Sequence, residues 1–294
     1  MRASAAPPAL APVLYQELVR GALAEDLGRA GDVTTDATVP SDRTGEGLIV
    51  ARRGGRIAGL DVALFAFRAL DPSTAAETLK GDGSDVEAGT LIARVRTGAR
   101  ALLTGERTAL NFLGHMSGVA TATRDTVRKL NGLETRVACT RKTTPGQRAL
   151  ETYAVRVGGG ESHRYGLEDA VIIKDNHVAL AGGIVPAVQG ARRNVGHLMK
   201  IEVEVDTLEQ LDEVLEIGVD VVLLDNMDLD TLREAVRRAR GRAVTEASGG
   251  IRPERVREVA ETGVDLISLG WLTHSAPSLD VGFDVPAYSS RTGH

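Results

Sequence analysis

The sequence predicts an α/β protein whose second half forms an incomplete or open α/β barrel. Short apolar runs rich in β-branched residues recur there, about every 21 to 23 residues from Lys200 onward. Runs of this length suit buried parallel strands, and their alternation with amphipathic segments predicts βα units. The six runs are 136–140, 170–173, 199–205, 220–224, 243–247 and 265–269. Six is fewer than the eight strands of a closed barrel, so either the barrel is incomplete or one strand lacks a readable signature.

The chain up to about residue 113 has a different pattern and is expected to be a separate α+β domain. Helices are expected over 14–26 and 61–70, and strands over 47–57 and 90–95. Turn chemistry is concentrated at 81–85 and 87–89. Residues 106–130 have mostly helical periodicity, with a break expected at 114–118, and would bridge the two domains. In the barrel half, two helices have clear apolar faces, formed by Leu208, Leu211, Val214 and Leu215 and by Leu232, Val236 and Ala239.

Composition excludes several classes of function. The 294 residues allow about two domains, and 43% hydrophobic content is enough for sizeable cores. Lys+Arg 35 against Asp+Glu 40 gives a net charge of −5, so a general nucleic-acid role has no electrostatic support. The one cysteine, Cys139, excludes an internal disulfide framework and a Cys-based zinc site. With no signal peptide and no apolar run near the roughly 18 residues of a membrane span, a cytoplasmic location is predicted.

Polar residues follow the predicted strands, and the C-terminal strand ends of a parallel barrel share the rim where ligands bind. The densest of these segments is 140–146. Together with two later loops it places five potentially cationic side chains near that rim: Arg141, Lys142, His163, Arg164 and Lys174. Guanidinium groups bind carboxylate or phosphate in a bidentate manner and lysine acts as a point charge, so this set suits a polyanion. The alternative is a solvated basic face.

Carboxylates occupy the middle of the predicted rim. Glu202 and Glu204 alternate along one strand and share a face, and Asp225 ends the next strand. Such groups can hold Mg²⁺, which keeps several waters and takes one or two carboxylates plus substrate phosphates. They can equally form ion pairs with nearby lysines and arginines, including Lys200, and spacing alone does not decide between the two.

Glycines follow the last two predicted strands. Ser248, Gly249 and Gly250 precede a helix expected to begin near Pro253, and Gly270 closes the last strand. Loops in this position of a barrel commonly bind a phosphate through backbone N–H groups. Tight βα turns also use glycine for steric reasons alone, so the position in the barrel is what favours a phosphate site.

With these pieces assembled, the chain resembles the quinolinate phosphoribosyltransferase family over nearly its whole length. The resemblance implies a sandwich-like N-terminal domain over 1–113, joined by the C-terminal segment 276–294, and a barrel domain over 114–275. It rests on the following motifs, in this order: 25–28 (EDLG), 31–36 (GDVTTD), 106–112 (ERTALNF), 117–121 (SGVAT), 140–146 (TRKTTPG), 163–164 (HR), 173–177 (IKDNH), 202–205 (EVEV), 224–226 (LDN) and 247–250 (ASGG).

The resemblance also implies an activity and a site. Quinolinate and phosphoribosyl pyrophosphate would give nicotinate mononucleotide, pyrophosphate and CO₂, with Mg²⁺ and no organic cofactor. The implied assembly is a homodimer in which Arg107 reaches the partner's active site, and a higher oligomer stays open. Lys142, Glu204 and Asp225 would be catalytic, and Glu204 and Asp225 would hold Mg²⁺ largely through substrate and water. The substrate-binding set would be Arg107, Arg141, Lys142, His163, Arg164, Lys174, Glu204, Asp225, Ser248, Gly249, Gly250 and Gly270.

Two other readings remain. One is a related phosphoribosyltransferase acting on another aromatic acid such as nicotinate, and the other is a catalytically silent barrel that only binds ligands. The full set of cations favours a dicarboxylate over a monocarboxylate. The chain departs from the family pattern at Cys139, Gln147 and Ser162, where an acidic residue, Leu and Asn are expected, and none of these removes a proposed charge. His115 in the bridging helix is expected to be structural.

Overall fold

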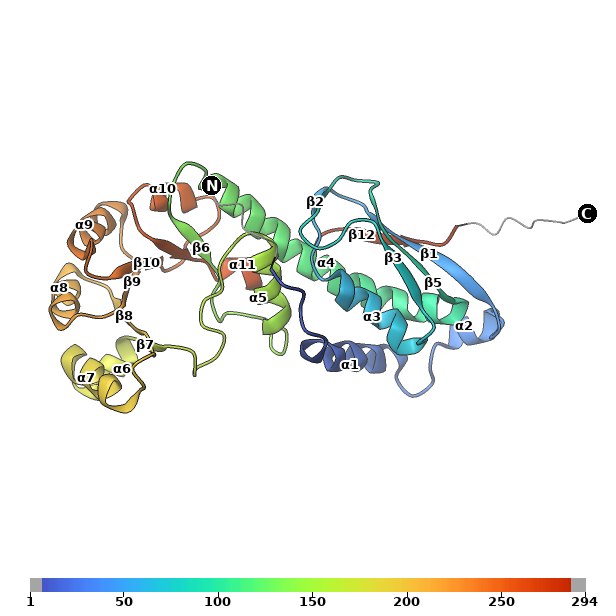
Figure 1. Cartoon of the computed structure of the whole chain (residues 1–294), viewed down its shortest axis with the longest axis horizontal. Coiled ribbons are helices and arrows are strands. Elements are labelled where there is room, and N and C mark those ends of the chain that lie inside the picture. Colours follow the sequence, from blue (N-terminus) through green and yellow to red (C-terminus); the bar gives the residue numbers. More distant parts are fainter. Residues whose placement is uncertain (1–6, 287–294) are drawn as a thin grey trace, which may run out of the picture. The chain divides into compact units, whose positions relative to one another are not determined.

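The structure is a computed structural model that describes residues 7–286 (Figure 1). Within this range the chain forms two compact units. The first contains residues 7–122, 145–159 and 276–286, and the second contains 123–144 and 160–275. The domain boundary at 113 and 114 stays a prediction, and the last part of the segment 276–294 lies outside the described residues.

The first unit is built on an antiparallel sheet with the strand order β12-β1-β5-β3. These strands are β12 (Val281–Asp284), β1 (Thr44–Ala51), β5 (Leu91–Gly98) and β3 (Ala75–Thr78). A second, small sheet pairs β2 (Gly55–Arg56) with β4 (Asp85–Val86). The strands expected over 47–57 and 90–95 are confirmed. Because β12 pairs with β1, the end of the described chain completes the N-terminal sheet.

The helices of the first unit include the two that the sequence predicts. Asp82, in the predicted turn segment, accepts hydrogen bonds from the backbone N–H groups of Gly59 and Leu60, where α3 begins, and from the hydroxyl of Tyr153. One carboxylate therefore caps a helix and ties it to a second helix. The elements are η1 (Pro12–Leu14), α1 (Gln16–Leu27), α2 (Val33–Thr38), α3 (Leu60–Leu70), α5 (Arg148–Val157) and α4 (Ala99–Lys129).

Helix α4 is longer than expected and unbroken, so the break predicted at 114–118 is wrong. The glycines there have a packing role. A Cβ atom on Gly114 would lie 2.9 Å from the carbonyl oxygen of Leu279, and one on Gly118 would lie 2.2 Å from that of Pro277. The C-terminal segment passes so close to the helix that only glycine fits beneath it.

The second unit is a six-stranded parallel sheet with the order β6-β11-β10-β9-β8-β7. All six predicted strands are present, as β6 (Arg136–Ala138), β7 (Val171–Ile173), β8 (Ile201–Val205), β9 (Val221–Asp225), β10 (Val244–Ser248) and β11 (Leu266–Ser268). In the described part of the chain β6 and β7 are the edges of this sheet, so its hydrogen bonding does not close a barrel. This agrees with the predicted incomplete or open α/β barrel.

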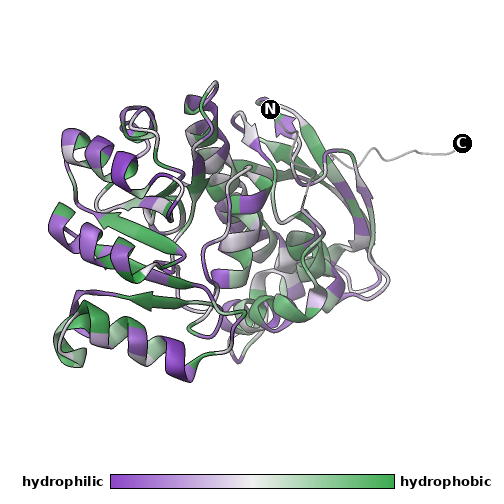
Figure 2. Ribbon diagram, turned by 60° about the vertical axis from the view of Figure 1, so that its left-hand side comes forward, coloured by the Kyte–Doolittle hydropathy of each residue, from purple (hydrophilic) through white to green (hydrophobic). Residues whose placement is uncertain are grey.

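Helices connect the strands of the second unit, as a βα pattern requires. Figure 2 shows largely hydrophobic strands and helices that carry hydrophilic residues. The predicted apolar faces are confirmed, since Leu211 and Val214 on α8 and Leu232 and Ala239 on α9 are buried. Helix α10 begins three residues after the expected start, because 253–255 form a turn. The helices are α6 (Asp175–Ala181), α7 (Ile184–Asn194), α8 (Leu208–Ile217), α9 (Leu229–Ala239), α10 (Val256–Ala260) and α11 (Trp271–His274).

Across residues 7–286, every helix is either too short or too polar to cross a bilayer.

The close contact at Gly118 generates a prediction about stability. Gly118→Ala should lower the free energy of unfolding by about 1–3 kcal/mol, because the added methyl group collides with backbone atoms that cannot move independently. Urea denaturation followed by circular dichroism measures this difference. The control is Gly21→Ala in α1, where nothing lies within 4 Å of the new atom. It should be stabilising by about 0.5–1 kcal/mol. Equal urea midpoints for Gly118→Ala and the wild type would refute the packing role.

Candidate active site

The C-terminal ends of the strands in the second unit surround a cavity of about 520 Å³. Every site residue predicted in this unit lines it, except Gly270. Cations come from the loops after β6 and β7 and from 163–164, carboxylates from β8 to β10, and glycines from the loop after β10. The lining is Thr140, Arg141, Lys142, His163, Arg164, Ile172, Lys174, Glu204, Leu223, Asp225, Asn226, Glu246, Ser248, Gly249, Gly250 and Ser268.

Two arginines in the cavity have unused hydrogen-bonding capacity. The Nε atoms of Arg141 and Arg164 are buried and have no hydrogen-bond partner among the described residues. One end of the Arg164 guanidinium is fixed, since its Nη1 donates to the carbonyl of Ala170 at 2.9 Å. Burial, and then the charge of Arg141, lowers the pKa of Arg164. Two guanidinium groups that repel each other, each with a buried Nε that lacks an acceptor among the described residues, are suited to an anionic ligand.

Lys174 and Glu204 form an ion pair at the ends of β7 and β8. The lysine side chain is 46% exposed and the glutamate only 12%, so the pair lies at the mouth of the cavity with its carboxylate inward. The backbone N–H of Lys174 donates to Nδ1 of His177 at 3.0 Å, which fixes the start of α6. The sequence left open whether the carboxylates hold a metal ion or form ion pairs with nearby cations. For Glu204 the structure contains such an ion pair.

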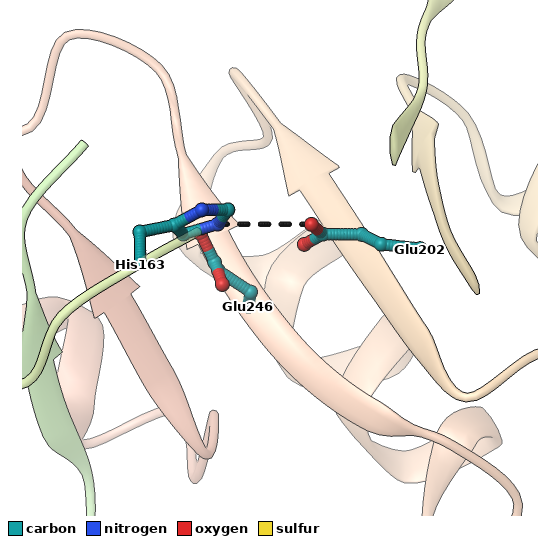
Figure 3. Close-up of side chains that lie close together, drawn as sticks. All are labelled: His163, Glu202 and Glu246. Carbon is teal, nitrogen blue, oxygen red and sulfur yellow. Dashed lines mark ion pairs between the residues drawn. The ribbon is translucent and has the colours of Figure 1, made fainter. Parts of the chain in front are cut away.

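The side chains of three ionisable residues, His163, Glu202 and Glu246, lie close together in a cluster (Figure 3). His163 Nε2 is 3.3 Å from Oε1 of Glu246 and 3.7 Å from Oε2 of Glu202. Both carboxylates are buried, with 4% and 6% of their surfaces exposed. On the other side of the ring, the backbone N–H of Arg164 donates to Nδ1 of His163 at 2.9 Å. The imidazole is thus held from both of its nitrogen atoms.

The cluster shifts the protonation of its members. Burial, and then the negative charge of Glu246, raises the pKa of Glu202 to about 7. Burial disfavours the imidazolium form of His163, but contact with Glu246 and the charge of Glu202 outweigh it and raise the pKa of the ring. Two carboxylates this close cannot both ionise cheaply, so protons near neutral pH are shared within the cluster.

The sequence interpretation missed Glu246. A signal for it was present, because Glu246 stands two residues before Ser248 on a predicted strand and must share its face. The register confirms the geometry: Glu246 lies opposite Leu223 of β9, which lies opposite Glu204 of β8. Glu202, predicted to share a face with Glu204, lies two residues earlier on β8, farther from the strand end, and contacts His163.

In the glycine loop after β10, the backbone lies close to the neighbouring loop that carries Asn226. Gly249 has φ +96°, and a Cβ there would lie 2.3 Å from Oδ1 of Asn226, which itself has φ 53°. At Gly270 a Cβ would meet the side chain of Lys142 at 2.9 Å. Ser248, Gly249, Gly250, Gly270 and Lys142 are among the residues that line a second cavity, of about 430 Å³. The glycines therefore leave space for Lys142 and for a group beside the loop.

Three other residues from the sequence interpretation lie outside these cavities. Arg107 is exposed on α4 in the first unit, and its role in a partner's site stays a prediction. His115 Nε2 is 2.9 Å from Oε1 of the fully buried Glu151, which agrees with the structural role expected for it. Cys139 is 2% exposed, a buried residue at the end of β6 as expected.

The fold and the cavity define an α/β protein whose strand ends line a cavity suited to an anionic small molecule, beside a candidate phosphate loop. Residues 32–117 match the N-terminal domain and residues 119–284 the C-terminal domain of quinolinate phosphoribosyl transferase. The chain therefore belongs to the quinolinate phosphoribosyltransferase family.

Individual relatives agree with this assignment. The chain is 44% identical to a probable nicotinate-nucleotide pyrophosphorylase [carboxylating] of Bacillus subtilis, over 89% of this chain and 90% of that one. It is also 44% identical to the nicotinate-nucleotide pyrophosphorylase [carboxylating] of Mycobacterium leprae, over 92% and 96%. Among solved structures, the nicotinate-nucleotide pyrophosphorylase of Francisella tularensis superimposes with a TM-score of 0.90 at 36% identity, over 94% and 98%.

The buried cluster predicts how stability depends on pH. The folded chain holds a proton on Glu202 up to about pH 7, whereas an unfolded glutamate loses it near its ordinary pKa of 4.5, so stability should fall as pH rises through this window. The raised pKa of His163 acts in the same direction, because its contribution is lost as pH rises through the folded value.

The measurement is urea denaturation of the wild type and Glu202→Gln at pH 5 and pH 8. In the wild type the free energy of unfolding should fall between pH 5 and pH 8. In Glu202→Gln this fall should be smaller by on the order of 2 kcal/mol, since a neutral amide carries no charge to bury. Glu213→Gln, the same change at an exposed position of α8, should keep the wild-type fall. An unchanged fall in Glu202→Gln would show that this carboxyl group does not titrate as described.

Proposed function

We propose that this chain transfers the phosphoribosyl group of phosphoribosyl pyrophosphate to quinolinate with loss of CO₂, in the de novo biosynthesis of NAD. The observation that carries the proposal is a cavity, in a chain of this family, where two arginines with buried, unpaired Nε atoms, a lysine–carboxylate pair and a glycine loop meet. The products would be nicotinate mononucleotide, pyrophosphate and CO₂.

Quinolinate would bind through its two carboxylates. Arg141 and Arg164 each bring a buried Nε donor that has no acceptor in the described part of the chain, and Lys174 lies at the mouth of the same cavity. A dicarboxylate supplies acceptors for both arginines, which removes the cost of leaving buried donors unpaired. Holding both carboxylates also fixes the ring in its plane, and with it the direction of the ring nitrogen.

Ribosyl transfer needs that nitrogen beside C1 of the ribose. The new C–N bond takes its electron pair from the nitrogen, and the pair of the broken C–O bond leaves with pyrophosphate. Positive charge develops on the ribose in reactions of this type, and the carboxylates of Glu204 and Asp225 would stabilise it. Lys142, which lines both cavities, would pair with phosphate oxygens.

Decarboxylation follows from the chemistry of the ring. Once the nitrogen carries the ribose it is cationic, so the electron pair left at C2 when CO₂ departs is stabilised by the adjacent charge. That carbon then takes up a proton. An organic cofactor is not required for either step.

Mg²⁺ is the metal ion that we propose for the reaction. It favours oxygen ligands and keeps several waters while binding few carboxylates. Glu204 and Asp225, at the ends of the paired strands β8 and β9, line one cavity and offer carboxylate oxygens, so these residues fit such an ion. When bound, the ion would neutralise charge on the departing pyrophosphate.

The 5′-phosphate would bind beside the glycine loop. Gly249 and Gly250 have positive φ angles, and Gly270 lines the same cavity of about 430 Å³. Glycine lets the backbone approach an anion closely. The phosphate would then lie near Lys142, and the ribose between the loop and the carboxylates.

A homodimer would complete the site through Arg107, which is exposed on α4. A third guanidinium group suits a ligand with two carboxylates. A cytoplasmic location remains part of the proposal.

The direct test is an assay of the purified chain with quinolinate, phosphoribosyl pyrophosphate and Mg²⁺ that follows nicotinate mononucleotide and CO₂ together. Equal amounts of both products are expected, with little product from nicotinate offered alone. Turnover of nicotinate in place of quinolinate would move the function to a related phosphoribosyltransferase, and failure to bind either substrate would favour the silent barrel.

In the same assay, Lys142→Ala and Glu204→Ala should each lower kcat by about 10²-fold or more, because each removes a charge that faces charge developing in the transition state. Lys80→Ala and Glu213→Ala are matched changes at exposed positions and should keep wild-type kinetics. Circular dichroism checks that all four variants are folded. Full activity of either site variant would remove its assigned role.

A shared site predicts complementation between inactive variants. Arg107→Ala and Glu204→Ala, unfolded together in equal amounts and refolded, should regain roughly one quarter of the wild-type activity, because half of the dimers are mixed and each has one intact site. Each variant refolded alone is the control. Mixed dimers that are verified by mass and still inactive would exclude donation of Arg107 across the interface.

A further inference from the structure

His163 lines the cavity, and both of its ring nitrogens have polar neighbours. Its Nδ1 accepts the backbone N–H of Arg164 at 2.9 Å, so that nitrogen carries a lone pair and no proton. The proton of the neutral ring is then on Nε2, which is directed toward Glu246 at 3.3 Å and Glu202 at 3.7 Å. The contact at 3.3 Å is not a hydrogen bond, since Oε1 of Glu246 has no hydrogen-bond partner among the described residues. It is a close polar contact that fixes the ring.

We propose that Glu246 is a positioning residue for the anion site, which holds Nε2 of His163 so that Nδ1 can receive the backbone N–H of Arg164. The inference rests on the proposed function. It gives His163, which the sequence predicts to be a substrate-binding residue, the additional part of a link between a buried strand and a substrate-binding arginine.

The loop that carries Arg164 shows why such a link is needed. The loop is fixed to β6 near its start, where the N–H of Glu161 donates to Val137 at 2.8 Å and its carbonyl accepts from Cys139 at 3.1 Å. Further on, the carboxylate of Asp169 accepts the backbone N–H groups of Tyr165 and Gly166. Between these two points, His163 connects the loop to the sheet through its contacts with Glu246 on β10 and Glu202 on β8.

Arg164 depends on this anchor for its direction. Its Nη1 is fixed to the carbonyl of Ala170, and its Nε is buried without a partner beside Arg141. A small rotation of the backbone at His163 would move the whole guanidinium group. Bidentate binding of a carboxylate tolerates little displacement, so loss of the anchor should weaken quinolinate binding and leave phosphoribosyl pyrophosphate binding intact.

A metal site is the competing interpretation of the cluster formed by His163, Glu202 and Glu246. His163, Glu202 and Glu246 are of the residue types that bind metals, and one ligand atom from each lies within 4.8 Å of the others. Positive charge on Arg164 and Lys174 already acts on Glu202. These positive charges already offset part of the negative charge of the cluster, so less of it is left to attract a divalent cation. A proton held within the cluster satisfies the chemistry without a metal ion.

Steady-state kinetics of Glu246→Gln test the proposal, because glutamine keeps the size of the side chain and removes its charge. The KM for quinolinate should rise about tenfold or more, the range typical of residues that orient a ligand. The KM for phosphoribosyl pyrophosphate should change less than about twofold, a difference too small to mark a lost contact. Glu161→Gln is the matched control, a half-exposed glutamate of the same loop whose side chain is paired with Arg136 and does not line the cavity. It should behave as the wild type.

A double-mutant cycle separates positioning from a direct effect. If Glu246 acts through His163, then His163→Ala should raise the KM for quinolinate as Glu246→Gln does, and the double variant should be no worse than the more severe single one. Independent, multiplying effects would overturn the proposal. So would a Glu246→Gln enzyme with an unchanged KM for quinolinate, or one with both KM values raised equally.

Nitrogen NMR of ¹⁵N-histidine-labelled protein tests the geometry without relying on activity. Above the pH at which His163 titrates, the wild type should show one ring with an unprotonated Nδ1 and a protonated Nε2, assigned by its loss in His163→Ala. In Glu246→Gln this ring should become a mixture of tautomers. An unchanged tautomer in Glu246→Gln refutes the anchor. Inactivity of the wild type with quinolinate refutes the proposed function alone.

Calorimetric titration with Zn²⁺ tests the metal reading. Wild type and Glu246→Gln should give the same heats, because the cluster takes no ion. Binding of one Zn²⁺ by the wild type that disappears in Glu246→Gln would overturn the proposal.

Discussion

The parallel register of β8, β9 and β10 is the constraint on which the site depends. It places Glu204, Leu223 and Glu246 in one row across three strands, and Ser248 beside Asp225 in a row nearer the strand ends. Side chains alternate between the faces of a sheet, so a slip of one residue in any strand would turn its carboxylate to the opposite face. The apolar residues between these positions, such as Val203 and Val222, are fully buried. Their burial is what prevents that slip, and the hydrophobic core therefore determines where the charges lie.

Those charges are an unfavourable arrangement for the protein on its own. Buried donors on Arg141 and Arg164 lack acceptors, and buried oxygens of Glu202 and Glu246 lack donors, among the residues described. Each such group destabilises the fold by about 1–3 kcal/mol. The sequence could be more stable with apolar residues at these positions. Keeping the charges separate, with the arginines available to a ligand and the carboxylates against His163, is what makes the cavity suited to an anion.

Much of this could be predicted from the sequence, for identifiable reasons. All six barrel strands were predicted, because buried parallel strands are continuous apolar runs, and most site residues follow from their position at strand ends. Two predictions failed where the deciding contact is distant in sequence. Gly118 suggested a helix break, but it packs against Pro277. Glu246 went unnoticed because its partner His163 lies far from it along the chain. The role of Arg107 depends on a second chain, which lies beyond what one sequence can place.

The unsatisfied arginine donors also bear on which aromatic acid the site accepts. A monocarboxylate such as nicotinate can offer acceptors to Arg141 or to Arg164, and leaves the other Nε buried and unpaired. A site with a buried polar group that the wrong ligand cannot satisfy discriminates more strongly than one that merely offers space. The tie from Glu246 through His163 to Arg164 strengthens this effect, because a fixed guanidinium group cannot move toward the one carboxylate present. Selectivity for the dicarboxylate then depends on how rigidly the second arginine is held.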